Sequence, residues 1–130
     1  MKKLNLLKYF FILLLAAVMF GFTGEPDNIN EALKSGNASD LKQNMNATVE
    51  LVILEKENVY SNIQAEQILK QFFSLHKPVS FQILHNGGNN NSQYYIGLLK
   101  TKTESFRIYY LLKIKDKRTL IYQLRIESDE

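Results

Sequence analysis

The fold is decided by residues 93–127, QYYIGLLKTKTESFRIYYLLKIKDKRTLIYQLRIE. β-Branched, aromatic and other apolar residues fill three runs, Gln93–Thr101, Phe106–Lys115 and Thr119–Glu127, and short polar links separate them. Such runs are typical of strands, and consecutive strands joined by short links pair antiparallel. The stretch therefore predicts a three-stranded antiparallel meander near the end of the chain.

A fourth strand is predicted just upstream, over Val79–His85, before a loop of Asn and Gly at residues 86–92. Apolar and polar residues alternate along it, which places His85 on the same face as Phe81 and Ile83. We therefore expect His85 at the lip of the loop, turned inward.

Helical patterns dominate the chain before this point. Residues 28–36 predict a short helix with Asn28 as its N-cap, and a second helical turn follows with Asn37 or Ser39 as its cap. Residues 47–54, ATVELVIL, are apolar and β-branched, which predicts one strand between these turns and the next helix.

A longer helix is predicted to begin at Ser61. Ser61 and Gln64 have the spacing of a capping box, and the helix runs to about Leu75, because Pro78 cannot continue it. Residues 55–60 before it predict a polar connection. Helices first and antiparallel strands last indicate an α+β fold, with N-terminal helices packed on a curved antiparallel sheet.

The chain begins with an export signal pattern. Three lysines fall within the first eight residues, and an apolar run follows at residues 9–20. A membrane-spanning helix needs about 20 apolar residues, so this run fits a signal peptide better. We predict a signal peptide over residues 1–23 and one domain over 24–130, exported to the periplasm or the extracellular space. The alternative is an uncleaved anchor, which would be the chain's one attachment to a membrane.

Composition excludes several kinds of chemistry. Three of the 16 Lys and Arg lie in the predicted signal peptide, which leaves 13 against 13 Asp and Glu and no basic excess for nucleic acid. There is no Cys, and the two His, nine residues apart, have no metal-site spacing. Phosphate-binding glycine loops and a GxSxG elbow are also absent from the sequence. We therefore predict no metal, no cofactor and no nucleic-acid partner.

Several sequence words resemble a known family. They are VELVILEKENVYSNIQAEQILKQFF, FQILHNGG, YYIGLL, FRIYYLLK and IYQLRIE. Together they are similar to small secreted bacterial proteins known only as a domain of unknown function, over about residues 28–127. The resemblance implies a nuclear transport factor 2-like, or cystatin-like, fold: a cone in which a curved sheet wraps around helices. It implies no activity and no catalytic residue.

Four residues are candidates for a ligand site at the mouth of such a cone: Tyr60, His85, Tyr94 and Tyr110. His85 would hold a ligand or shuttle a proton, or it would be a strand-end residue bonded to the loop. Isomerases and dehydratases of the broader fold place an acid or a His–Asp pair inside the cone, so an enzyme using Glu50, Tyr60 or His85 is an alternative. Fold alone does not transfer that chemistry.

The outer face of the meander mixes aromatic, apolar and charged residues, as protein interfaces do. We predict a homodimer through this face, with Tyr95, Arg107, Tyr109, Gln123 and Arg125 at the interface. The favoured function is a secreted, non-catalytic binding module. It would hold a small apolar ligand in the cone or an envelope protein on the sheet face. The alternatives are the isomerase- or hydratase-like enzyme and a structural envelope protein.

Overall fold

A computed structural model describes residues 26–130, in which three helices and six strands form one α+β unit. The signal-peptide prediction for residues 1–23 lies outside the described residues. The elements, in chain order, are α2 (Asp27–Ser35), α3 (Ala38–Gln43), β1 (Met45–Ile53), β2 (Lys56–Ser61), α4 (Asn62–Leu75), β3 (Ser80–Gly88), β4 (Ser92–Lys100), β5 (Ser105–Lys115) and β6 (Arg118–Ser128).

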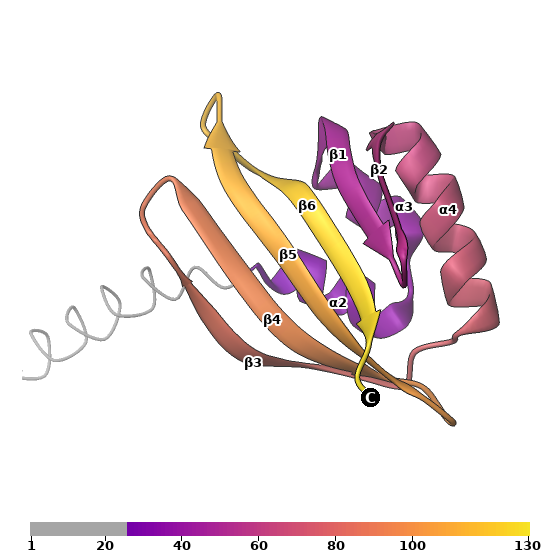
Figure 1. Ribbon diagram of the computed structural model, residues 1–130. Helices are drawn as coiled ribbons and strands as arrows, with labels where there is room; N and C mark the ends of the chain where they lie inside the picture. Colours follow the sequence, from indigo (N-terminus) through magenta and orange to yellow (C-terminus); the bar gives the residue numbers. More distant parts are fainter. Residues whose placement is uncertain (1–25) are drawn as a thin grey trace, which may run out of the picture.

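The six strands form one sheet in the order β2-β1-β6-β5-β4-β3 (Figure 1). β1 and β2 make a hairpin at one edge, and α4 then carries the chain across to β3 at the other edge. The predicted meander returns from β3 to β6, which lies beside β1. The α+β prediction is confirmed, with one refinement: β1 and β6 are parallel and the other four pairs are antiparallel.

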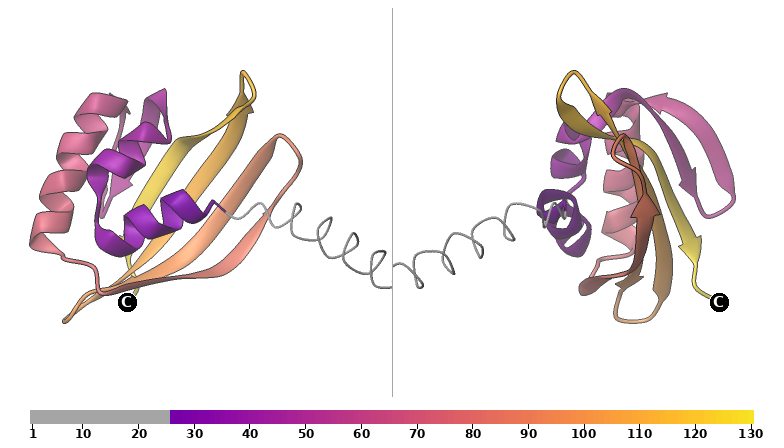
Figure 2. Two further views of the ribbon diagram at one scale, coloured as in Figure 1. Left: turned by 180° about the vertical axis from the view of Figure 1, so that it is seen from behind. Right: turned by 90° about the vertical axis from the view of Figure 1, so that its left-hand side faces the viewer.

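All three helices lie on one face of the curved sheet, here called the inner face (Figure 2). Strand register aligns Leu51, Leu124, Tyr110 and Tyr95 in one row across four strands of this face. All four side chains are buried. Each contributes about 1.5–3 kcal/mol by leaving water, so this row and its neighbours anchor the core.

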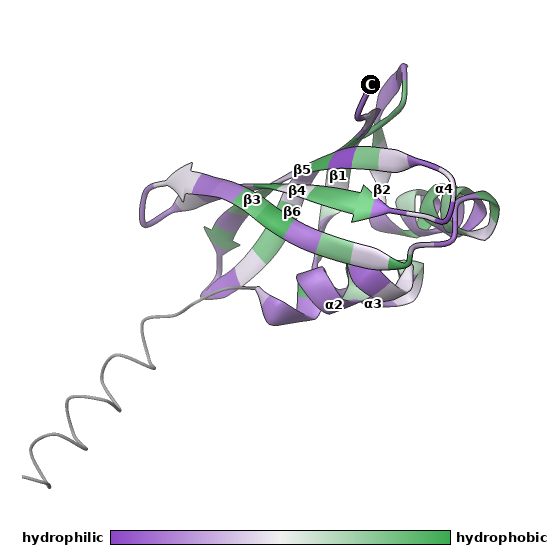
Figure 3. Cartoon of the chain, turned by 90° about the horizontal axis from the view of Figure 1, so that it is seen from below, coloured by the Kyte–Doolittle hydropathy of each residue, from purple (hydrophilic) through white to green (hydrophobic). Residues whose placement is uncertain are grey.

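The outer face carries a different row, and the helices leave it uncovered (Figure 1). Register places Val52, Arg125, Tyr109, Ile96 and His85 side by side across five strands. Successive strand residues point to opposite faces, so hydropathy alternates along the strands (Figure 3).

The sequence-based prediction missed β2. Residues 55–60 were expected to form a polar connection, but a two-residue turn at Leu54 and Glu55 pairs Ile53 with Lys56. Leu54 adopts φ 57°, in the left-handed region that such tight turns require. β2 is an edge strand with mostly exposed side chains, so its sequence resembles that of a loop.

Two of the three helix caps predicted from the sequence are present in the structure. The capping box of α4 is formed: Ser61 Oγ accepts from Gln64 N, and Gln64 Oε1 accepts from Ser61 N, both at 3.2 Å. Asn37 caps α3 by accepting from Asp40 N. The Asn28 prediction for α2 is wrong, because that helix begins at Asp27 after Pro26 and has no side-chain cap.

Candidate binding groove

An open groove of about 980 Å³ runs between α4, the β1–β2 hairpin and the end of β6. Its volume lies at the upper end of the range of about 300–1,000 Å³ that is usual for ligand pockets. Seven of its 13 lining residues are apolar or aromatic, and the other six are polar or charged. The lining residues are Leu51, Ile53, Leu54, Glu55, Lys56, Tyr60, Ile68, Gln71, Phe72, Leu75, His76, Glu127 and Ser128.

One wall of the groove is a helix face. Ile68, Phe72 and Leu75 are spaced four and three residues apart, so they lie on the same side of α4. Phe72 is buried in the core, Ile68 is half-buried, and Leu75 is 73% exposed. The wall therefore changes from packed core to open surface toward the end of the helix.

The opposite wall includes the strained turn of the β1–β2 hairpin. Leu54 is 44% exposed and keeps a left-handed backbone. A non-glycine residue pays about 1–2 kcal/mol for that conformation. Two large apolar side chains, Leu54 and Leu75, thus meet water in the same groove, and a ligand that covered them would remove that surface from solvent.

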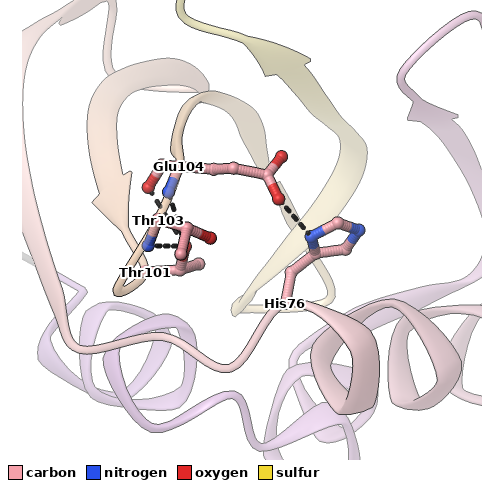
Figure 4. Close-up of polar contacts among 4 residues, drawn as sticks. All are labelled: His76, Thr101, Thr103 and Glu104. Carbon is pink, nitrogen blue, oxygen red and sulfur yellow. Dashed lines mark hydrogen bonds and ion pairs between the residues drawn. The ribbon is translucent and has the colours of Figure 1, made fainter.

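His76 forms the end wall of the groove. Its ring lies 4.7 Å from the Phe72 ring and 5.1 Å from the Phe106 ring, between centroids. Its Nδ1 lies 3.4 Å from Oε1 of Glu104, in the turn between β4 and β5 (Figure 4). Thr101 Oγ1 accepts from Glu104 N at 3.0 Å, which fixes this turn. The end wall therefore ties α4 to the sheet.

Of the four predicted ligand-site residues, the structure places Tyr60 in the groove wall. Tyr110 lies on the inner face, fully buried, and its hydroxyl donates to Asn30 Oδ1 of α2 at 2.7 Å. Protein atoms already cover it, so its predicted place at a cavity mouth is wrong.

His85 and Tyr94 lie on the outer face, away from the groove. A bulge between Ile83 and His85 shifts the register by one residue, so His85 pairs with Ile96 instead of continuing the Phe81–Ile83 face. A bulge of this kind exchanges the two faces for every residue beyond it. The Tyr94 ring lies close over Gly87, where a Cβ would meet it, and stacks at 6.0 Å on Tyr109. The predicted inward positions of His85 and Tyr94 are wrong.

Tyr95 was predicted at the outer interface but is a core residue. It pairs with Tyr110 across β4 and β5, is buried, and stacks on that ring at 5.1 Å. The adjacent tyrosines 94 and 95 were thus assigned to the wrong faces. The other four predicted interface residues lie on the outer face: Arg107, Tyr109, Gln123 and Arg125.

Glu50 also lies on the outer face, next to Glu57 of the neighbouring strand. A hydrogen bond with the Glu57 side chain raises the pKa of Glu50, and partial removal from water and the charge of Glu57 raise it further, while Arg125 opposes the shift. Glu50 lies near the β2 edge of the sheet and His85 on β3 at the other edge, so the structure does not bring them together.

Sequence reasoning missed Leu54, Leu75, His76 and Glu104. A weak signal existed for two of them, because Leu75 and His76 end a helix just before Pro78. Nothing in the sequence marked the turn at Leu54. Within residues 26–130, no three His, Asp or Glu side chains gather as metal ligands. The helices of this part of the chain are all too short or too polar to cross a membrane.

The fold is that of an α+β protein of the nuclear transport factor 2-like, or cystatin-like, class. A domain of unknown function with a cystatin-like fold from Nostoc punctiforme is similar (10% identity, 80% of this chain and 72% of that chain, TM-score 0.64). A designed nuclear transport factor 2-like protein is similar too (14% identity, 77% and 90%, TM-score 0.65).

More particularly, the chain belongs to the DUF4783 family, described as a domain of unknown function, which matches residues 26–127. A solved family member from Bacteroides uniformis is 30% identical over 81% of this chain and 97% of that chain, with TM-score 0.77. Another, from Bacteroides fragilis, is 32% identical over 80% and 98%, with TM-score 0.76. No curated protein matches the chain.

Proposed function

We propose that this protein is a non-catalytic binding module that holds a small apolar ligand in the groove beside α4. The groove itself carries the proposal, because it combines an apolar wall with two exposed leucines, Leu54 and Leu75. Apolar surface removed from water stabilises a complex by about 25 cal/mol per Å². Leu51 and Phe72 of the groove wall are buried core residues, so this part of the wall needs little ordering when a ligand binds.

Titration with the neutral fluorescent probe N-phenyl-1-naphthylamine tests this proposal on the full-length protein. We expect saturable binding that Leu75→Asp weakens about tenfold or more, because a charge replaces an apolar contact worth about 1.5–3 kcal/mol. Ile63→Asp is the matched control, because Ile63 is exposed on the same helix but does not line the groove. Binding that survives Leu75→Asp, or that falls equally in both variants, would contradict the proposal.

We also propose that a second copy of the chain binds the outer face, which lies opposite the groove. Tyr109 and Ile96 lie side by side on that face, where both are partly exposed and no helix covers them. Arg107→Glu or Tyr109→Ala should shift a dimer toward monomer in sedimentation. An unchanged dimer in both variants would exclude this face.

Export to the periplasm or beyond is a further proposal, and it depends on the pattern of residues 1–23. Cell fractionation tests it: the protein should be found outside the cytoplasm, and cytoplasmic protein of full-length mass would contradict it.

A further inference from the structure

The groove adjoins a second hollow of about 510 Å³ on the far side of Leu75 and His76. Both side chains line both spaces, so a ligand lying across them would touch the two at once. The hollow is formed by the chain after α4 and the turn between β4 and β5. Its other lining residues are Lys77, Pro78, Val79, Thr101, Lys102, Thr103 and Glu104.

The two spaces differ in charge. In the groove, Glu55 is balanced by Lys56, and Glu127 is paired with Arg125 at 2.9 Å. The hollow has two lysines and one carboxylate.

That carboxylate, Glu104, is turned toward His76 at 3.4 Å, and no described residue forms a salt bridge with Lys77 or Lys102. An apolar, neutral space thus adjoins a smaller one with a net positive charge.

We infer that the groove and the hollow form one site for a single-chain anionic amphiphile. Its hydrocarbon chain lies in the groove, and its acid group lies at Lys77 and Lys102. This inference rests on the proposed function and names the ligand class.

The position of Leu75 supports this arrangement. It is 73% exposed where the two spaces meet, so a chain crossing it gains apolar contact before the head group reaches the lysines. The C-terminal end of α4 and the Glu104 carboxylate both oppose an anion here, and the two lysines offset them.

Calorimetric titration of the full-length protein with decanoate and with decanol tests the inference. The double variant Lys77→Gln/Lys102→Gln should weaken decanoate binding by about fivefold, because exposed charge pairs contribute modestly, and should leave decanol unchanged. Added salt should weaken decanoate alone. Lys115→Gln, at the opposite end of β5, is the matched control and should change neither.

The outcomes separate the two proposals. Equal binding of decanoate and decanol, unaffected by the lysine variant, would overturn the anionic head group but leave the apolar groove intact. Tighter binding of decyltrimethylammonium than of decanoate would also overturn it. Failure of every amphiphile to bind would overturn both. Binding to phosphatidylglycerol vesicles without binding monomeric decanoate would overturn a site for a free amphiphile.

Discussion

Two regions of the inner face differ in whether protein side chains fill the space between sheet and helices. Beside α2, the space is filled: Tyr110 is fully buried, stacks on Tyr95 and donates to Asn30. Beside the end of α4, the same sheet leaves a groove, and Ile53, Tyr60 and Ile68 are only partly buried. We call these the filled region and the open region.

The difference shows that hydrophobicity alone does not close a sheet face. The filled region has a large aromatic pair, and both of its tyrosine hydroxyls have acceptors: Tyr110 donates to Asn30 on the helix above it, and Tyr95 donates to Gln93. The open region is lined by aliphatic side chains together with Tyr60 and Phe72, and it has a strained turn at Leu54 and His76 at its end. The groove has room for a ligand because the protein's own side chains do not fill the space beside the end of α4.

The largest change in the free energy of unfolding should come from removing a side chain that fills the filled region. Tyr110→Ala should lower the free energy of unfolding by about 3–5 kcal/mol, because a large buried aromatic side chain leaves a cavity. Leu75→Ala in the open region should stay within about 0.5 kcal/mol, because that side chain is mostly exposed. Urea unfolding measures both. Similar losses for the two variants would remove the distinction between the regions.

A smaller loss of stability is expected when only the hydrogen bond of Tyr110 is removed. Tyr110→Phe keeps the packing but removes the donor to Asn30 Oδ1, so we expect a loss of about 1 kcal/mol in the same unfolding experiment. Tyr122→Phe is the matched control and should be neutral, because phenylalanine keeps the ring that lies under Lys113 Nζ. A neutral Tyr110→Phe would mean that packing alone fills this region.

The smallest change in stability is expected at Glu50, which lies on the outer face and outside both regions. The raised pKa of Glu50 means that the folded protein holds this proton more tightly than the unfolded chain, so ionisation destabilises the fold. Glu50→Gln should therefore stabilise the protein at pH 7 by a few tenths of a kcal/mol, roughly the size of cross-strand charge effects. The gain should disappear below about pH 4.5, where the carboxyl is protonated in both states. A gain that persists in acid would show that charge is not its cause.

Much of the fold could be predicted because local signals agreed. The capping box at Ser61 and Gln64 located the start of α4, and the polar links located the meander. The sheet face to which each side chain points was harder to predict, because side chains alternate between the faces only until a bulge interrupts the strand. The bulge beyond Ile83 placed His85 on the face opposite to the predicted one, because strand pairing, and not the nearby sequence, sets that face.

The groove could not be predicted, because its walls come from distant segments. Leu54, Leu75 and Glu127 lie far apart in the sequence, and only the tertiary fold brings them together. Tyr60 was predicted as a candidate at the mouth of the cone, but the residues that line the groove with it were not.

The most direct test of the account is a methyl-labelled NMR titration of the full-length protein with decanol. We expect chemical-shift changes at the groove methyls of Ile53, Leu54, Ile68 and Leu75, with none at Leu33, Leu41 and Ile121 of the packed core. Changes confined to the outer-face methyls of Val52, Ile96 and Leu111, or no saturable change at all, would contradict a ligand site in the open region.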